Sequence, residues 1–299
     1  MNIIIIGAGA IGTYLAAAIS REYNVTLVGK KGHHLKDHFK VIQKNGILLS
    51  GFQTLMSNVL TTRELKIIPE NSLILVTTKA YDVKTVFTDL ASIVKKDTVF
   101  MLIQNGIGVK EEVENILPNE IIRAVTGIGA EIIRPGEVRT SWGKVVLENT
   151  PSAQKVYDIF KKSSFATRIS DNIKSEEWLK LSINAFVNPL TALLQIRSFM
   201  LSKPEIRGLV ERVIDEVLAV AEKEGYQVPR DKVIKTIDRL HQYHNYSSMY
   251  QDIKKGKKTE LDYITGAIIQ RAKKHHISVP YNEFLYDAIK YMEKYGYNK

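Results

Sequence analysis

The sequence predicts an α/β domain built on a doubly wound, mostly parallel sheet, followed by an all-α domain. Over the N-terminal third, short apolar runs alternate with helical patterns, which is typical of βαβ units. A glycine-rich turn, GAGAIG, joins the first apolar run to the first helical pattern. From Ser175 onward almost only helical patterns follow, and we therefore assign residues 1–170 to the first domain and 171–299 to the second.

The elements of the first domain can be placed in order along the chain. Strands are expected at residues 3–6, 24–28, 72–78 and 98–103, with helical segments at 13–21 and from residue 82 onward. A longer polar region separates the second strand from the third. Residues 130–141 hold a Pro-Gly turn between two strand-like runs and, with 144–149, are expected to extend the sheet as a β-hairpin. A helix at 152–162 and a strand at 166–169 close the domain.

The second domain is expected to be helical. Long helical patterns lie at residues 204–224, 230–243, 259–275 and 281–296. Ser175 and Thr259 are expected to be N-caps, since acidic residues follow each of them and favour a first helical turn. Pro189 is expected to disfavour helix at Asn188 and to kink the helix there.

The composition is that of a globular protein, with 44% hydrophobic and 25% charged residues among 299. No apolar run reaches about 18 residues, and the start MNIIIIGAGAIG lacks the features of a signal peptide. We therefore expect no membrane span and a cytoplasmic location. The chain has no cysteine, which excludes disulfides and thiol chemistry.

The net charge of +10 permits three interpretations. These are nucleic-acid binding, steering of small anions, and a lysine-rich composition without functional meaning. Lysines are scattered over both halves with small clusters such as KKGKK, and the sequence has no zinc-finger spacing, RNA-binding aromatic signature or basic tail. We therefore expect no nucleic-acid partner. Either a monomer or a homodimer is compatible with the sequence.

Gly7, Gly9 and Gly12 in GAGAIG follow the G-x-G-x-x-G spacing of a Rossmann-type dinucleotide site. The first glycine allows a tight turn, the second lets the backbone approach a pyrophosphate, and the third lets the helix pack closely on the strand. The turn follows four isoleucines and opens a helical pattern, which is the context that this motif requires. We expect the dinucleotide to contact the whole loop: Gly7, Ala8, Gly9, Ala10, Ile11 and Gly12.

The residues after the second strand favour NADP(H) over NAD(H). An NAD site usually places Asp or Glu at the end of that strand, where it binds the ribose 2′-hydroxyl. Here Lys30 and Lys31 follow the strand, and no acid occurs before Asp37. Cations at this place attract the 2′-phosphate of NADP(H). The alternative is that Lys30 and Lys31 are solvated loop lysines without a ligand.

Two polar residues follow successive strands, at the edge where doubly wound sheets bind their ligands. Lys79 follows the strand at 72–78, and Asn105 follows the strand at 98–103. Taken singly, Lys79 would be interpreted as a surface cation and Asn105 as part of an ordinary Asn-Gly turn. Together, beside a dinucleotide loop, they are candidates for a ligand-binding cleft.

A buried-looking helical segment, WLKLSINAFVNPLTAL, carries polar residues at regular intervals. Lys180, Asn184 and Asn188 are four residues apart and stack on one helix face over roughly 12 Å. That length suits a small polar substrate and a nicotinamide edge, and the alternative is a stripe that water or neighbouring helices satisfy. Farther on, Ser248 at an expected helix start and Glu260 are candidates for ligand binding or for helix capping. The 7 histidines show no metal-site spacing, so no metal is expected.

Together these motifs resemble the ketopantoate reductase (2-dehydropantoate 2-reductase) family over essentially the whole chain. The resemblance rests on GAGAIG, on KAYD at residues 79–82 and QNG at 104–106, and above all on KLSINAFVNPLTAL at 180–193 and SSMYQDIKKGKKTELDYITG at 247–266. It implies a Rossmann-type domain followed by a helical domain like the C-terminal one of 6-phosphogluconate dehydrogenase. It also implies NADPH-dependent reduction of 2-dehydropantoate to (R)-pantoate in pantothenate and coenzyme A synthesis.

The resemblance implies a role for each matching residue. Lys180 matches the general acid of the family. The family's substrate-binding groups match Asn184, Asn188, Ser248 and Asn105, the last of which would also touch the cofactor. Its cofactor contacts match Lys79, Glu260 and Lys30, and Lys30 stands where many members carry Arg for the 2′-phosphate.

One position departs from the family pattern. After the NPLTAL segment the family often has a further Asn for the substrate, and the nearest equivalent here is Ser198. Two alternatives therefore stay open: an NADP-dependent reductase of another small 2-keto acid, and a dinucleotide-binding sensor without turnover. The intact set of polar residues argues against the sensor, which need not keep the acid Lys180.

Overall fold

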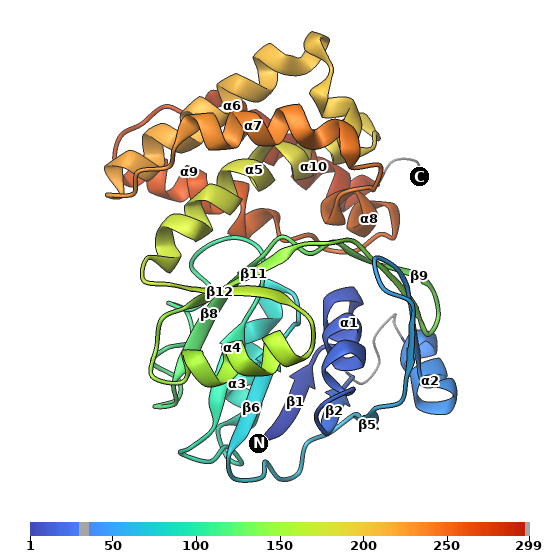
Figure 1. Cartoon of the computed structure of the whole chain (residues 1–299). Coiled ribbons are helices and arrows are strands. Elements are labelled where there is room, and N and C mark those ends of the chain that lie inside the picture. Colours follow the sequence, from blue (N-terminus) through green and yellow to red (C-terminus); the bar gives the residue numbers. More distant parts are fainter. Residues whose placement is uncertain (30–35, 297–299) are drawn as a thin grey trace. The chain divides into compact units, whose positions relative to one another are not determined.

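The computed structural model describes residues 1–29 and 36–296, which form two compact units (Figure 1). The first unit comprises Met1–Gln104 and Val109–Ile173, and the second comprises Lys174–Lys299 together with the short segment Asn105–Gly108. The predicted succession of an α/β part and a helical part is confirmed. The roles expected for residues 1–170 and 171–299 stay predictions.

An eight-stranded sheet forms the centre of the first unit, in the order β12-β11-β8-β7-β6-β1-β2-β5. Its strands are β1 (Asn2–Ile6), β2 (Val25–Val28), β5 (Leu60–Thr62), β6 (Ser72–Val76), β7 (Val99–Leu102), β8 (Ile121–Thr126), β11 (Lys144–Glu148) and β12 (Ala166–Ser170). Neighbouring strands run parallel, except that β8 and β11 are antiparallel. The isoleucines of β1 are all buried, as expected for a central strand of a parallel sheet that is covered on both faces.

Helices connect the strands of this sheet. They are α1 (Ala10–Ile19), α2 (Lys36–Asn45), α3 (Val83–Leu90) after the short 3₁₀ turn η1 (Ala80–Asp82), and α4 (Ala153–Lys162). Helix α1 is apolar on almost every side, and residues 12–19 are all buried. Such a helix needs partners on opposite sides. It packs on β1 and β2 of the main sheet and also on a second, smaller sheet (Figure 1).

The smaller sheet corrects one expectation. It has the order β4-β3-β10-β9 and consists of β3 (Ile47–Gly51), β4 (Leu55–Ser57), β9 (Ala130–Arg134) and β10 (Glu137–Thr140). The hairpin expected at residues 130–141 forms, but the expectation that it extends the main sheet is wrong. The polar region after β2 contains β3, whose buried Ile47 and Leu49 share a core with Val138 and whose backbone pairs with β10. Strand β11 extends the main sheet instead.

The second unit consists of helices and 3₁₀ turns around one apolar core. They are α5 (Ile173–Leu194), η2 (Ser198–Ser202), α6 (Pro204–Lys223), α7 (Arg230–Arg239), η3 (Leu240–Gln242), α8 (Ser248–Lys254), η4 (Leu261–Tyr263), α9 (Thr265–Lys274) and α10 (Pro280–Tyr295). The helices expected at 204–224 and 281–296 correspond to α6 and α10. The helix expected at 230–243 ends in η3, and the one expected at 259–275 divides into η4 and α9.

Helix α5 differs from expectation at two places. It begins at Ile173, whose side chain is buried, so Ser175 lies in the first turn and is not the N-cap. It also continues through Asn188 and Pro189, so the expectation that helix is disfavoured at Asn188 is wrong. Proline removes one backbone donor, but the flanking turns are packed into the core, and the hydroxyl of Thr191 hydrogen-bonds back to the preceding turn.

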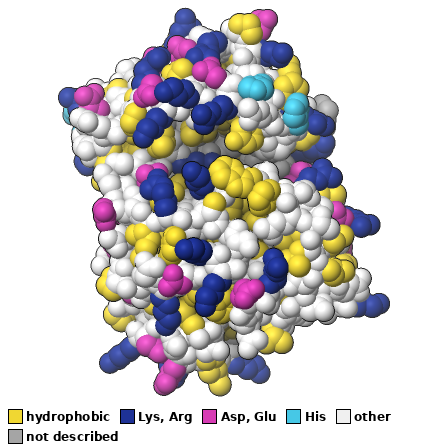
Figure 2. All heavy atoms as spheres, in the orientation of Figure 1, with side chains coloured by type: hydrophobic (Ala, Val, Ile, Leu, Met, Phe, Trp, Pro, Cys, Tyr) yellow, Lys and Arg dark blue, Asp and Glu magenta, His cyan; other side chains and the backbone are white. Residues whose placement is uncertain are grey.

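Charged side chains are dispersed over the surface that Figure 2 shows, where Asp and Glu lie among the Lys and Arg side chains. Within residues 1–29 and 36–296, no helix is both long and apolar enough to cross a membrane. The same residues contain no group of three or more His, Asp or Glu side chains that could hold a metal ion.

A buried histidine joins three elements of the first unit. His38 of α2 is 3% exposed, and its Nδ1 accepts a hydrogen bond from the N–H of Gly136 at 3.0 Å. Its Nε2 lies 3.1 Å from the hydroxyl of Thr13 in α1. Because Gly136 donates to Nδ1, the neutral ring carries its hydrogen on Nε2, toward Thr13. Burial lowers the pKa of His38 from 6.5 to about 4.

We expect acid to destabilise this unit through His38. Its pKa is lower in the folded than in the unfolded state, so its contribution is complete above about pH 6.5 and is lost as the pH falls toward 4. The loss should be at most about 3 kcal/mol of unfolding free energy. Urea unfolding of the wild type and of His38→Gln over this pH range checks the prediction, because the variant lacks the titrating ring. Equal pH slopes for the two proteins would contradict it.

Candidate active site

The glycine turn of the first unit is as tight as its motif requires. Gly7 has a φ of +115°, and a Cβ added there would lie 2.8 Å from the backbone nitrogen of Thr78. A Cβ at Gly12 would lie 1.9 Å from the carbonyl oxygen of Gly7, so α1 can pack here only without a side chain. Gly9 differs, because among the described residues no atom lies within 4 Å of its added Cβ. The space beside Gly9 fits the approach of a pyrophosphate to the backbone.

The N-terminus of α1 provides the second part of this candidate site. The helix begins at Ala10, directly after Gly9, and has no acidic residue in its first turn. Its first N–H groups lack partners within the helix and lie at the positive end of the helix dipole, which favours an anion. The structure brings the expected loop contacts together: Gly7, Ala8, Gly9, Ala10, Ile11 and Gly12. Lys30 and Lys31 lie outside the described residues.

A threonine that the sequence alone did not indicate holds this turn. The hydroxyl of Thr77, directly after β6, lies 3.1 Å from the carbonyl oxygen of Ile6 and 2.9 Å from that of Gly7. It thereby ties the carboxyl ends of β1 and β6 together. Its sequence signal is weak, because threonine is common at strand ends. Lys79 follows, half-buried, at the start of η1, which is the strand end where it was predicted.

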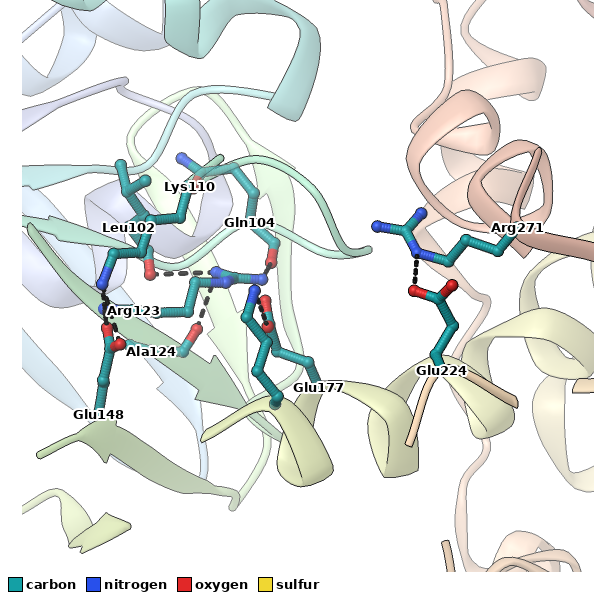
Figure 3. Close-up of polar contacts among 10 residues, drawn as sticks. Leu102, Gln104, Lys110, Arg123, Ala124, Glu148, Glu177, Glu224 and Arg271 are labelled. Carbon is teal, nitrogen blue, oxygen red and sulfur yellow. Dashed lines mark hydrogen bonds and ion pairs between the residues drawn. The ribbon is translucent and has the colours of Figure 1, made fainter. Parts of the chain in front are cut away.

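Buried polar side chains also hold the carboxyl ends of β6 and β7, one of them from β8 (Figure 3). The amide of Gln104 donates to two carbonyl oxygens at the end of β6, which are 2.6 and 3.2 Å away. The guanidinium of Arg123 is 2% exposed. It donates to three backbone carbonyls at 2.7 to 3.1 Å, those of Leu102, Ala124 and Gln104. These bonds fix the chain immediately before Asn105.

The predicted polar stripe exists on α5 of the second unit. Lys180, Asn184 and Asn188 lie one turn apart on one face, while most other residues of the helix pack into the apolar core. Asn184 and Asn188 are 6% and 5% exposed. In the described part of the chain, neither the ammonium of Lys180 nor the amide of Asn188 has a hydrogen-bond or ion-pair partner. Lys180 is half-buried, and polar groups that are partly withdrawn from water without a protein partner favour a bound polar ligand.

The segment Asn105–Gly108 groups with the second unit and is held there by a close backbone contact. Gly106 has a φ of +85°, and a Cβ added there would lie 2.2 Å from the carbonyl oxygen of Tyr263 in η4. The same carbonyl accepts a hydrogen bond from the N–H of Ile107 at 3.1 Å. Only glycine fits this approach with this backbone conformation. The Asn-Gly turn therefore brings Asn105 to the segment that carries Glu260.

Asn105 links two other predicted site residues. Its amide donates to Oε2 of Glu260 at 3.1 Å, and its Oδ1 accepts a hydrogen bond from the amide of Asn184 at 3.3 Å. Glu260 is 6% exposed. The neighbouring Thr259 is held by Glu293 of α10, whose Oε1 accepts both its N–H and its hydroxyl at 2.7 Å. Asn184, Asn105 and Glu260 thus form one connected row of polar groups.

Neighbouring residues perform the capping that was the alternative role of Ser248 and Glu260. The side chain of Ser247 caps α8 by accepting a backbone N–H at 3.2 Å. The hydroxyl of Thr259 accepts the N–H of Leu261 at 3.1 Å, but the N-cap of η4 is Glu260, so the expectation that Thr259 is the N-cap is wrong. Ser248 is exposed at the start of α8, and within the described residues its hydroxyl has no partner. Glu260 makes no side-chain cap bond.

The environment of Lys180 changes its acidity. Burial lowers the pKa of this ammonium below its usual value of 10.5. An ammonium beside two carboxamides can bind a carbonyl oxygen, stabilise negative charge on that oxygen and transfer a proton to it. The arrangement on α5 is therefore chemically able to assist the reduction of a carbonyl group.

A dinucleotide turn on an α/β unit and a lysine-amide stripe on a helical unit define a class, the nicotinamide-dinucleotide-dependent oxidoreductases. Comparison with known families identifies the particular one. Residues 3–152 match the family Ketopantoate reductase PanE/ApbA, and residues 172–293 match Ketopantoate reductase PanE/ApbA C terminal. The chain belongs to the ketopantoate reductase family.

Similar proteins extend over the full chain. The 2-dehydropantoate 2-reductase of Pyrococcus horikoshii is 30% identical, with 99% of each chain covered, and that of Pyrococcus abyssi is 31% identical, with 97% of each covered. A solved structure of D-mandelate dehydrogenase with NADH and anilino(oxo)acetate has a TM-score of 0.90 at 27% identity, covering 98% of this chain and 99% of its own. A ketopantoate reductase from Ralstonia eutropha JMP134 has a TM-score of 0.89 at 26% identity, with the same coverage.

Replacing Gly106 should disrupt the second unit. In Gly106→Ala the added Cβ would overlap the carbonyl of Tyr263, and the positive φ would be strained, so we expect a loss of roughly 2–4 kcal/mol of unfolding free energy. Gly208→Ala is the control, since Gly208 is exposed on α6 with no described atom within 4 Å of an added Cβ. It should be neutral or stabilise by about 0.5–1 kcal/mol. Chemical unfolding of both variants distinguishes a specific contact from a general effect of alanine.

Proposed function

We propose that this chain is a 2-dehydropantoate 2-reductase, which forms (R)-pantoate with NADPH for pantothenate and coenzyme A synthesis. Curated relatives with that name are 30% and 31% identical to it over almost the full length of both chains. The observation that carries the proposal is the Lys180 ammonium, which has no partner among the described residues and lies in line with two asparagines on a helix packed into the core. Burial of a cation is unfavourable unless a polar or anionic group compensates it.

The proposed chemistry assigns the proton to Lys180. When bound, the reduced dinucleotide supplies a hydride to the C2 carbonyl carbon of the keto acid. Lys180 stabilises the negative charge that grows on the carbonyl oxygen and then donates a proton to that oxygen. Because burial lowers its pKa, this ammonium is a stronger acid than an exposed lysine, which favours the transfer.

The remaining polar groups would orient the keto acid. Asn184, Asn188 and Ser248 offer amides and a hydroxyl that suit the carboxylate and the hydroxyl group of the substrate. The amide of Asn188 and the hydroxyl of Ser248 are available, since neither has a partner in the described part of the chain. Asn105 would contact both ligands, because its amide group connects Asn184 to Glu260.

The cofactor would be held mainly by the first unit. The open backbone beside Gly9 and the first N–H groups of α1, which have no partner within the helix, suit the pyrophosphate, and Lys79 and Glu260 would make further contacts. The preference for NADPH rests on the sequence, in which Lys30 and Lys31 follow β2 and no acid occurs between β2 and Asp37. D-mandelate dehydrogenase, a close structural neighbour, was solved with NADH, and a comparison of NADPH with NADH therefore tests this preference.

A second candidate is reduction of another small 2-keto acid. Two observations favour it: Ser198 replaces the further Asn of the family pattern, and the structural similarity to D-mandelate dehydrogenase is as high as that to a ketopantoate reductase. Ser198 is 3% exposed, and its N–H donates to the carbonyl of Asn245 at 3.1 Å. A sensor without turnover is the weakest alternative, because Lys180 would serve no purpose in it.

Oxidation of NADPH, followed at 340 nm, tests the proposal. Ketopantoate is compared with 3,3-dimethyl-2-oxobutanoate, which lacks only its hydroxyl, and with phenylglyoxylate, the keto acid that corresponds to mandelate. We expect kcat/KM for ketopantoate to exceed that of the hydroxyl-free acid by about 100-fold or more, because a site built for a hydroxyl leaves its own groups unpaired without one. Higher kcat/KM with phenylglyoxylate would favour the second candidate, and no turnover with any of the three would reject both.

The same assay tests cofactor choice. NADH in place of NADPH should lower kcat/KM, and Lys30→Asp should reduce that difference by weakening NADPH binding. Equal use of both cofactors by the wild type would contradict the assignment of NADPH.

Removing the ammonium of Lys180 should impair the chemical step. Lys180→Met keeps an unbranched side chain, and we expect kcat to fall by about 10² to 10⁴, with NADPH binding retained. In the wild type, the rate should fall as the pH rises through the lowered pKa of Lys180, because the deprotonated amine can neither stabilise the charge nor donate a proton. Lys223→Met, at an exposed position of α6, is the control. Single-turnover rates within a few-fold of wild type would remove Lys180 from the mechanism.

A further inference from the structure

The polar face of α5 has a fourth member. At about 100° per residue, Lys180, Asn184, Asn188 and Thr191 lie at about 0°, 40°, 80° and 20° around the helix axis. Thr191 therefore continues the stripe, although its spacing from Asn188 is three residues and not four. Its side chain is 0% exposed, whereas Lys180 is half-buried.

The hydroxyl of Thr191 is bound within the protein. Its oxygen lies 2.6 Å from the carbonyl oxygen of Val187 and 2.6 Å from the hydroxyl oxygen of Ser247. Ser247 in turn accepts the N–H of Tyr250 at 3.2 Å as the N-cap of α8. A continuous row of hydrogen bonds thus runs from the first turn of α8 to the turn of α5 that carries Asn188.

This row of hydrogen bonds lies beside the proline of α5. Pro189 supplies no N–H, so the turn around Asn188 lacks one helical hydrogen bond. Ser248 directly follows Ser247 in the chain, and its hydroxyl has no partner within the described residues. The contact between Thr191 and Ser247 therefore sets the place of Ser248 relative to the polar face of α5.

We infer that Thr191 and Ser247 are positioning residues, which hold the Ser248 hydroxyl and the Asn188 amide at the separation that the keto acid requires. This inference rests on the proposed role of Asn188 and Ser248 in substrate binding. Neither Thr191 nor Ser247 needs to touch the substrate, because both hydroxyls are already satisfied by the protein. Their effect is on affinity, since misplacement of a binding group by even 1 Å can weaken productive binding strongly.

The test compares Thr191→Val, which removes the hydroxyl at similar size, with Thr191→Ser, which keeps it. Ser182→Ala is the matched control: Ser182 is also buried on α5 and donates to a carbonyl one turn back, at 2.8 Å, but it lies about 200° from Lys180. Thr191→Val should raise KM for the keto acid roughly fivefold to tenfold, with kcat and the NADPH Kd changed less than about twofold. Thr191→Ser and Ser182→Ala should keep KM near the wild-type value.

Hydrogen exchange gives a readout that needs no turnover. The N–H of Tyr250 should exchange at least about tenfold faster in Thr191→Val, because the cap on α8 loses its support, and should be unchanged in Ser182→Ala. Should Thr191→Val fail to fold, Ser247→Gly removes the same contact from the other side, since glycine remains an acceptable N-cap. Unchanged exchange at Tyr250 in a folded variant would overturn the inference.

A double-mutant cycle tests whether Thr191 acts through Ser248. In the background of Ser248→Ala, adding Thr191→Val should change KM less than about twofold, because the positioned group is already absent. If Thr191→Val raised KM by the same factor in the wild type and in Ser248→Ala, the inference would be overturned and the proposed function would remain. An unchanged KM in Thr191→Val would have the same consequence. A wild type that neither binds nor reduces a 2-keto acid would overturn the proposed function, and the inference with it.

Discussion

The close approach of Gly106 to the carbonyl of Tyr263 is the contact on which the hydrogen-bonded row of Asn184, Asn105 and Glu260 depends. It is possible because glycine tolerates the positive φ and leaves room for the carbonyl oxygen. The contact places Asn105 within hydrogen-bonding distance of both Asn184 and Glu260. A residue that follows a strand of the first unit is thereby built into the helical unit, and the buried carboxylate of Glu260 gains an amide donor.

The parts of the fold that local patterns encode were predictable. The strands β1, β6 and β7 are runs of apolar residues between turns, and the helices of the second unit follow the helical period. The polar stripe was predictable for the same reason, since residues four apart on any helix share a face. The continuation of α5 through Pro189 was not predictable in this way, because it depends on the packing of both flanking turns into the core.

Long-range pairings were not predictable. The pairing of β3 with β10 joins segments about ninety residues apart, and the residues of a strand do not specify which distant strand it will pair with. The bond between Asn105 and Glu260 spans 155 residues. Which of the two serines, Ser247 or Ser248, caps α8 was also not predictable, because either could cap a helix that begins at this place. Only the structure distinguishes the capping hydroxyl from the available one.

The insertion of Asn105–Gly108 into the second unit also bears on how such a protein can be recombined. The chain crosses from one compact unit to the other three times, after Gln104, after Gly108 and after Ile173. A gene fragment that begins at codon 173 would encode the helices that pack in the second unit's core but would omit the loop that fits against η4. Exchange of the helical half between homologous genes therefore preserves this fit where the retained loop has glycine at the position of Gly106, because its partner is a backbone carbonyl.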